Sequence, residues 1–148
     1  MEPPEHDDEP NAPEVTLHLR VGLWGLLLFA LLGLGLEALH AYKAPLYLDV
    51  ANETRRLLWR LGHAHGALLS LFNVVIALAV PRLHRKNPSR RRLGSRALVS
   101  ATVLLPAGFW LAGLGAESGD AGAGIALVPA GAVLLAVALF TFARGIDR

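Results

Sequence analysis

Four long apolar stretches, separated by clumps of charge, constrain the fold of this chain more than any other feature. The sequence is 53% hydrophobic and 18% charged, whereas a soluble domain carries about 25% charged residues. Six of the twelve acidic residues lie within the first fourteen positions, and seven of the fourteen lysines and arginines lie between residues 81 and 97. This clumping is typical of an integral membrane protein, because the apolar stretches between the charges are long enough to cross a bilayer.

The apolar stretches predict an all-α membrane protein with four transmembrane helices. A bilayer core is crossed by about 20 apolar residues at 1.5 Å per residue, and spans at about 17–41, 57–80, 93–115 and 122–143 meet this requirement. The connections are short, which favours an up-down-up-down bundle. We therefore expect one transmembrane domain over residues 16–148. Residues 1–15 read as a disordered, acidic, proline-rich tail.

The lysines and arginines predict how the spans are oriented. If both termini lie on one side of the membrane, that side carries ten of these residues and the other side carries four. Short loops rich in Lys and Arg stay in the cytoplasm. The expected location is therefore the inner or plasma membrane of a bacterial cell, with both termini cytoplasmic.

The basic segment 81–96 indicates a lipid partner rather than a nucleic acid, because it flanks apolar spans where anionic headgroups lie. A membrane-protein partner or a second copy of the chain is also expected, since small residues on the helix faces permit close approach. No nucleotide site is expected, because no strand precedes the glycines and no Lys-Ser or Lys-Thr follows them. The residues expected to contact headgroups and set topology are Arg82, Arg85, Lys86, Arg90, Arg91 and Arg92.

A few polar side chains interrupt the spans, and a shared depth predicts that they meet. Glu37 on the first span and His63 on the second each lie about one turn inside the same membrane boundary. A carboxylate inside a span costs about 3 kcal/mol, so it usually faces the interior and has a partner. The predicted intramembrane cluster comprises Glu37, His40, His63, Ser70, Asn73 and Trp110.

Several functions fit this cluster. Glu37, His40 and His63 can supply three ligands to one divalent metal with a position left open, although the sequence has no Cys to add a thiolate. His40 and His63 can instead hold a haem between neighbouring helices. The same groups can relay a proton or line a pocket for a small aromatic substrate.

A purely structural role is the competing interpretation. Glu37 and His63 can pair across two helices and lock their register, while Ser70 and Asn73 form interhelical hydrogen bonds. No complete catalytic set is visible, so a non-catalytic membrane subunit or interaction protein without a cofactor is favoured over an enzyme. A ligand, haem or metal pocket near the outer leaflet is the alternative.

The other histidines are expected to be less important. His65 is turned about 120° from the helix face that carries His63, Gly66, Ser70 and Asn73, so it faces another helix or extends towards the interface. His18 and His84 are expected at the cytoplasmic surface, with no specific role.

The second span resembles the corresponding helix of small four-span bacterial membrane proteins such as the hydroxylaminobenzene mutase group. The residues that carry the resemblance are His63, Gly66 and Asn73, followed by Pro81-Arg82-Leu83. The spacing of Asn73 departs from that group's pattern, and Trp110 is preceded by Phe109 rather than by the asparagine of the group's Asn-Trp pair. The resemblance therefore implies an isomerase of small aromatic substrates only as one version of the pocket hypothesis.

Overall fold

The computed structural model describes residues 12–49, 53–80 and 87–145, and this part of the chain is almost entirely helical. The long helices are α1 (Ala12–Ala41), α2 (Glu53–Ala79), α3 (Pro88–Leu114) and α4 (Leu127–Ala143), and the short 3-10 helix η3 (Ala123–Ala126) leads into α4. Four helical segments, with η3 and α4 counted as one, are long and apolar enough to cross a membrane. The prediction of a four-helix, membrane-compatible fold is confirmed.

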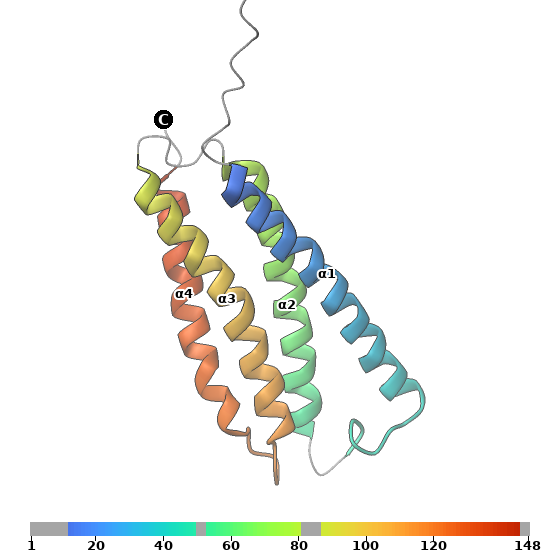
Figure 1. Ribbon diagram of the computed structural model, residues 1–148. Coiled ribbons are helices and arrows are strands. Elements are labelled where there is room, and N and C mark those ends of the chain that lie inside the picture. The colour runs from blue at the N-terminus through green and yellow to red at the C-terminus, as the bar shows by residue number, and fades with distance from the viewer. Residues whose placement is uncertain (1–11, 50–52, 81–86, 146–148) are drawn as a thin grey trace, which may run out of the picture.

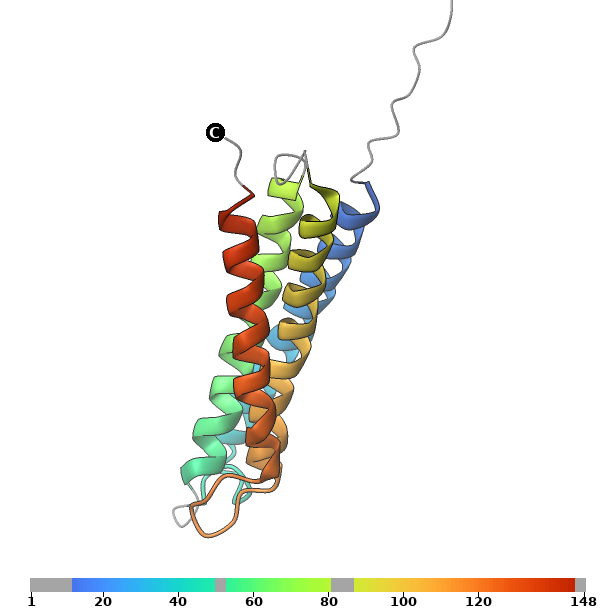
Figure 2. The same cartoon turned by 90° about the vertical axis from the view of Figure 1, so that its left-hand side faces the viewer.

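The helices form an open four-helix bundle (Figures 1 and 2). Extensive backbone packing joins α1 to α2, α2 to α3 and α3 to α4, whereas α1 contacts α3 only slightly. Within the described residues, α1 and α4 do not pack closely on each other. In both views the described ends of the chain lie at the same end of the molecule. The four helices therefore form a curved row in which α1 depends mainly on α2.

The first helix begins at Ala12, five residues before the expected start and inside the segment expected to be disordered. Pro13 suits the first turn, where a missing N–H leaves no bond unmade. Glu14 suits the same turn, because a carboxylate is favourable near the positive end of the helix dipole. The remainder of the predicted tail, residues 1–11, lies outside the described residues.

The third helix also begins earlier than expected, at Pro88 rather than near residue 93. The Asn87 side chain caps it by accepting a hydrogen bond from the Arg90 backbone N–H at 3.1 Å. Proline at the first helical position completes this start signal. Arg90, Arg91 and Arg92 therefore lie on a helix rather than in a loop, so they occupy different faces of that helix.

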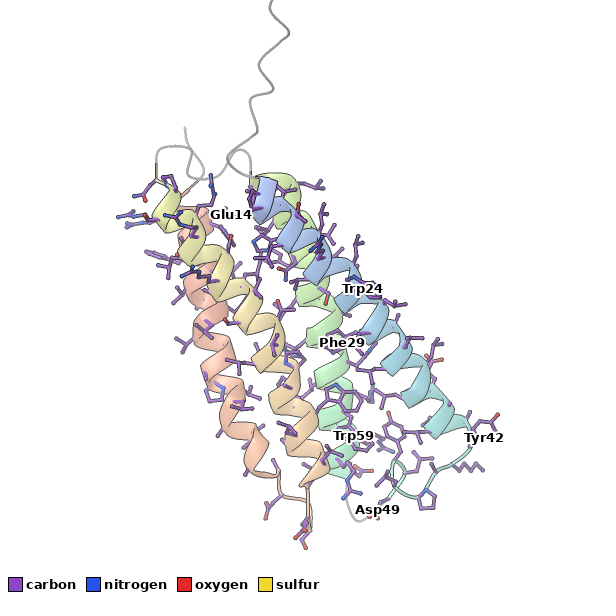
Figure 3. All side chains as sticks on the ribbon, viewed as in Figure 1. Glu14, Trp24, Phe29, Tyr42, Asp49 and Trp59 are labelled. Atoms are coloured by element: carbon purple, nitrogen blue, oxygen red, sulfur yellow. The ribbon has the colours of Figure 1, made fainter. Side chains whose placement is uncertain are left out.

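Small residues let α1 and α2 approach closely. A methyl group placed on Gly25 would lie 2.2 Å from Ser70 Oγ, and one placed on Gly66 would lie 2.1 Å from the Phe29 ring. Real Cβ atoms do not approach other atoms so closely, so each glycine makes room for a side chain of the partner helix. Phe29 is labelled in Figure 3. The expected small-residue contact between spans therefore lies within the chain, along the α1–α2 seam.

Arg55 forms hydrogen bonds at the end of the molecule that lies away from the described termini. Its guanidinium donates to the backbone oxygens of Gly113 at 3.2 Å and Ala116 at 3.0 Å. These carbonyls lie at the C-terminal end of α3, where a cation is favourable. Thr54 adds a bond to the backbone oxygen of Gly119 in the tight turn between α3 and η3. The start of α2 is therefore fixed against the end of α3.

Candidate functional site

A pocket of about 740 Å³ lies between α1 and α2 at the end of the molecule away from the described termini. It brings together three of the predicted cluster residues, Glu37, His40 and His63, with two arginines of α2. The sequence had placed Glu37 and His63 at the same depth on neighbouring helices. Because these helices run antiparallel and pack together, residues of equal depth meet. The complete lining is Gly33, Leu36, Glu37, His40, Ala41, Tyr47, Arg56, Arg60 and His63.

His63 is the most firmly positioned polar residue of this α1–α2 pocket. Its Nδ1 lies 2.8 Å from the backbone oxygen of Phe29 on α1. A carbonyl oxygen only accepts, so Nδ1 carries the proton and donates it. The ring lies over Gly33, where an added Cβ would be 2.5 Å from Cε1. In the neutral ring Nε2 therefore has a lone pair, and no hydrogen bond occupies it among the described residues.

Glu37 and His63 share the pocket but do not pair. Over residues 12–49, 53–80 and 87–145, no hydrogen bond or ion pair joins Glu37 to His63 or His40. The Glu37 side chain is exposed, and the proton-bearing nitrogen of His63 is bonded to Phe29. The pair expected between Glu37 and His63, which would fix the register of the two helices, is therefore not formed. His63 instead bonds the backbone of α1.

A metal site receives no support from the described side chains. No group of three or more His, Asp or Glu residues lies close enough together there to hold a metal ion. Glu37, His40 and His63 line one pocket without forming such a group. Haem held by His40 and His63 is untested and stays a prediction.

An aromatic stack closes one side of the pocket. The Tyr47 ring lies edge-on to His40, with centroids 6.4 Å apart, and stacks on Trp59 at 6.3 Å. Trp59 stacks in turn on Trp110 at 5.4 Å and donates its indole N–H to the Trp110 backbone oxygen at 3.3 Å. Tyr47 is buried, so it belongs to this stack, whereas Tyr42 is exposed as an interfacial tyrosine would be.

Trp110 does not reach the α1–α2 pocket, although its depth predicted that it would. It lies behind Trp59 and lines a separate apolar groove between α1 and α3, of about 350 Å³. Its indole nitrogen is buried and makes no hydrogen bond within the described structure. Depth along a helix was predicted correctly for Trp110, but the direction of its side chain around the helix axis was not.

Ser70 and Asn73 lie deeper on α2 and separate from the pocket. Ser70 donates to the backbone oxygen of Gly66 in its own helix at 2.7 Å, so it is not the interhelical bond that was expected. Asn73 does join helices, because its amide nitrogen donates to Thr102 Oγ1 on α3 at 2.8 Å. The predicted cluster therefore divides into a pocket and a separate buried network.

His18 completes that network, and sequence reasoning missed it. The side chain was expected at the surface, but it is fully buried. Its Nδ1 lies 2.7 Å from Asn73 Oδ1 on α2, and its Nε2 lies 2.9 Å from Ser95 Oγ on α3. His84, the other histidine expected at that surface, lies outside the described residues. The early start of α1 explains the difference, because it places His18 in the second turn of the helix instead of at its end.

The hydrogen-bond directions in the His18 network are mutually consistent. The Asn73 amide nitrogen donates to the backbone oxygen of Leu69 and to Thr102, so Asn73 Oδ1 must accept from His18 Nδ1. The neutral ring then accepts at Nε2 from the Ser95 hydroxyl. Thr102 donates onward to the backbone oxygen of Leu98 at 2.8 Å. Every side-chain donor and acceptor in the chain from His18 to Thr102 is therefore engaged.

An ion pair lies at the same end of the molecule as the His18 network. Arg91 Nε donates to Glu14 Oε2, and both side chains are largely buried. Figure 3 labels Glu14 near the start of α1. Arg91 was expected to contact headgroups with Arg90 and Arg92, but α3 turns it towards α1. Arg90 and Arg92 are exposed, as headgroup contact requires, and the other three residues of that set lie outside the described residues.

His65 packs against another helix, as one of its two predicted orientations requires. Its ring centroid lies 5.0 Å from that of Phe109 on α3, and its Nδ1 is bonded to the backbone oxygen of Leu61 in its own helix. His65 therefore contributes to packing between α2 and α3.

Comparisons with known proteins identify no relative of this chain: no protein family, no curated protein and no solved structure matches it.

Proposed function

We propose that this protein binds a small amphiphilic molecule in the α1–α2 pocket, at one boundary of the membrane. The observation that carries the proposal is that polar groups in this pocket have no partner among the residues that the structure describes. Glu37, Arg60 and His63 Nε2 all line it, and within the described part of the chain no hydrogen bond or ion pair occupies them. Charged groups near a membrane core usually have partners, so a ligand is the partner that we infer.

The lining suits an amphiphile better than a purely polar molecule. Leu36 and Tyr47 supply apolar surface, and Tyr47 stacks on Trp59 behind it. Ligand pockets combine mostly apolar walls with a few placed polar groups. His63 adds an acceptor whose tautomer is set by the Phe29 backbone. We propose binding rather than catalysis, because no nucleophile stands beside a base in the pocket.

The proposed location is the bacterial inner or plasma membrane, with both termini cytoplasmic and an up-down-up-down path. Ten lysines and arginines on one side against four on the other support this orientation. The pocket would then face the outside. Cysteine labelling tests this proposal: in a chain without native cysteine, a cysteine at Ser118 should react from outside, and one at Asn87 only after lysis. The reverse pattern would contradict it.

A role as a membrane subunit or interaction protein is the second candidate. The apolar groove between α1 and α3 favours it, because α4 packs on the far side of α3 and leaves this groove uncovered by protein. A lipid-facing groove of this kind can receive another helix. Crosslinking in native membranes through a cysteine at Val103, an exposed residue of the groove, tests this role. A cysteine at the exposed Leu139 of α4 is the control.

The direct test of ligand binding uses the full chain purified in mild detergent. A panel of amphiphiles is screened by their effect on the melting temperature, since a ligand that binds only the folded state stabilises it. We expect at least one compound to raise the melting temperature in the wild type but not in Glu37→Gln or His63→Ala. Glu117→Gln, in the turn between α3 and η3, is the matched control and should behave as wild type. A panel without any such compound would contradict the proposal.

An absorbance spectrum and elemental analysis of the same preparation test the two cofactor versions of the pocket. Haem would give a Soret band that His40→Ala or His63→Ala removes. A divalent metal would be retained at one equivalent per chain and lost in Glu37→Gln.

A further inference from the structure

The α1–α2 pocket carries opposite charges on its two walls, and this arrangement identifies the class of ligand. Glu37 belongs to α1, whereas Arg56 and Arg60 belong to α2. Arg56 already bonds the exposed Glu53 at 3.2 Å, a weak pairing for groups on the surface. Arg60 and Glu37 make no ion pair in the described structure. Their charges are therefore available to a molecule between them.

The packing register places these charges at the same height. Gly25 lies against Ser70 and Gly33 against His63, so residue numbers of facing positions add up to about 95. Continued along the antiparallel pair, this register puts Glu37 level with residues 58 and 59. That height lies between Arg56 and Arg60, which are about one helical turn apart. The carboxylate thus stands opposite the two guanidiniums, with the pocket between them.

A ligand with only one sign of charge would match one wall and oppose the other. An anion would pair with the guanidiniums and leave Glu37 beside like charge. A cation would do the reverse. A molecule that carries both an ammonium and a phosphate satisfies both walls, because each charge then receives a charge-assisted hydrogen bond.

We propose that the α1–α2 pocket binds a zwitterionic aminophosphate group, with its ammonium on Glu37 and its phosphate on Arg60 and Arg56. This inference rests on the proposed ligand-binding function and specifies its ligand. The group can be the headgroup of an ethanolamine phospholipid or a free aminophosphate. The apolar surface of Leu36 and Tyr47 beside the charges favours the lipid, and the experiment separates the two sources.

The test titrates the full chain in detergent with three probes and follows the melting temperature. The probes are short-chain phosphatidylethanolamine, short-chain phosphatidylglycerol, which lacks the amine, and glycerophosphoethanolamine, which lacks the chains. We expect phosphatidylethanolamine to bind at least about tenfold more tightly than phosphatidylglycerol, as one extra charge-assisted bond implies. Glu37→Gln should remove that preference. Arg60→Gln should weaken both lipids, while Glu117→Gln should change neither.

The outcomes separate this inference from the function on which it rests. Equal binding of the two lipids by the wild type, or an unchanged preference in Glu37→Gln, would overturn the aminophosphate assignment. Glycerophosphoethanolamine binding as tightly as the phospholipid would support the chemistry and identify a free aminophosphate as the source. If none of the probes binds but another amphiphile does in a Glu37-dependent way, the assignment fails and the proposed function stands. If nothing binds, both fail.

Discussion

Two polar clusters lie along α1 and α2, and they differ in whether their hydrogen-bonding groups have partners among the described residues. Around His18, each donor meets an acceptor on another helix or on the backbone, and the side chains are buried. Around His63, one ring nitrogen is bonded to the backbone, and the nearby charges of Glu37 and Arg60 face a pocket unpaired within the described residues. A satisfied cluster holds helices together, whereas an unsatisfied one is ready to bind.

The sequence had assigned helix locking and ligand binding to the same residues. The polar side chains inside the spans predicted a single cluster, in which Glu37 and His63 either lock the register or bind a ligand. In the structure the two tasks are separated along α2. Asn73 forms the lock with His18, and His63 lies in the pocket. Each prediction below tests one side of that division, from the largest expected effect to the smallest.

Replacing His18 by alanine should have the largest effect on stability. The change removes two interhelical bonds and leaves Asn73 Oδ1 without its donor in a buried site. Loss of a buried partner together with a small cavity predicts destabilisation by about 2–3 kcal/mol. Unfolding of the purified protein by a denaturing detergent measures it.

His40→Ala is the matched control for His18→Ala. His40 is exposed, its ring meets the edge of the Tyr47 ring, and its side chain makes no hydrogen bond or ion pair with the described residues, so its loss should change stability by less than about 0.5 kcal/mol. If the two variants unfolded at the same detergent concentration, the His18 network would not be the lock that we infer.

Gly66→Ala should disrupt the seam that positions both clusters. The added methyl group would lie 2.1 Å from the Phe29 ring, which must move. Overpacking of this kind costs about 1–3 kcal/mol. The control is Gly35→Ala on α1, the other helix of the seam, where an added Cβ meets nothing within 4 Å. There the higher helix propensity of alanine should leave stability unchanged or raise it by up to about 1 kcal/mol. The same detergent titration compares the two, and effects of equal sign would contradict the close approach at Gly66.

Much of the fold was predictable from the sequence, because span length and apolarity depend on local composition. The helix starts were less predictable, since Asn87-Pro88 looks like a loop until its cap is seen, and Pro13 looks like part of a tail. These errors had consequences. A start five residues earlier carries His18 inside the bundle, so a histidine dismissed as superficial became the centre of the buried network.

The sequence predicted how deep the site residues lie along their helices, but not towards which neighbouring helix each side chain points. Glu37, His40 and His63 meet at one pocket because antiparallel neighbours of known length fix relative depth. Trp110 has a similar depth, yet it faces the α1–α3 groove. The angle of a side chain around its helix axis depends on which neighbour packs most closely, and here the α1–α2 glycines decide it. Arg56 and Arg60 were not predicted as site residues, although their spacing of four residues already placed them on one face of α2.

Glu37→Gln should separate binding from stability at the pocket. The Glu37 side chain is exposed and makes no bond within the described structure, so the substitution should change the free energy of unfolding by less than about 0.5 kcal/mol. Ligand affinity should nevertheless fall at least about tenfold, because a charge-assisted bond is lost. Detergent unfolding and ligand titration on one preparation measure the two quantities. A clear loss of stability without ligand would show instead that Glu37 supports the fold.

Ser70→Ala should have the smallest effect and should distinguish the two polar residues that the sequence grouped together on α2. Among the described residues the Ser70 hydroxyl bonds only the backbone of its own helix, and such a bond adds little to helix stability. We expect a change of less than about 0.5 kcal/mol, measured by detergent unfolding. Asn73→Ala is the comparison: it frees His18 Nδ1–H and removes the bond to Thr102, and it should cost about 2 kcal/mol. A polar residue inside a span therefore joins helices only where its hydrogen bond crosses between them, and equal losses in the two variants would refute that distinction here.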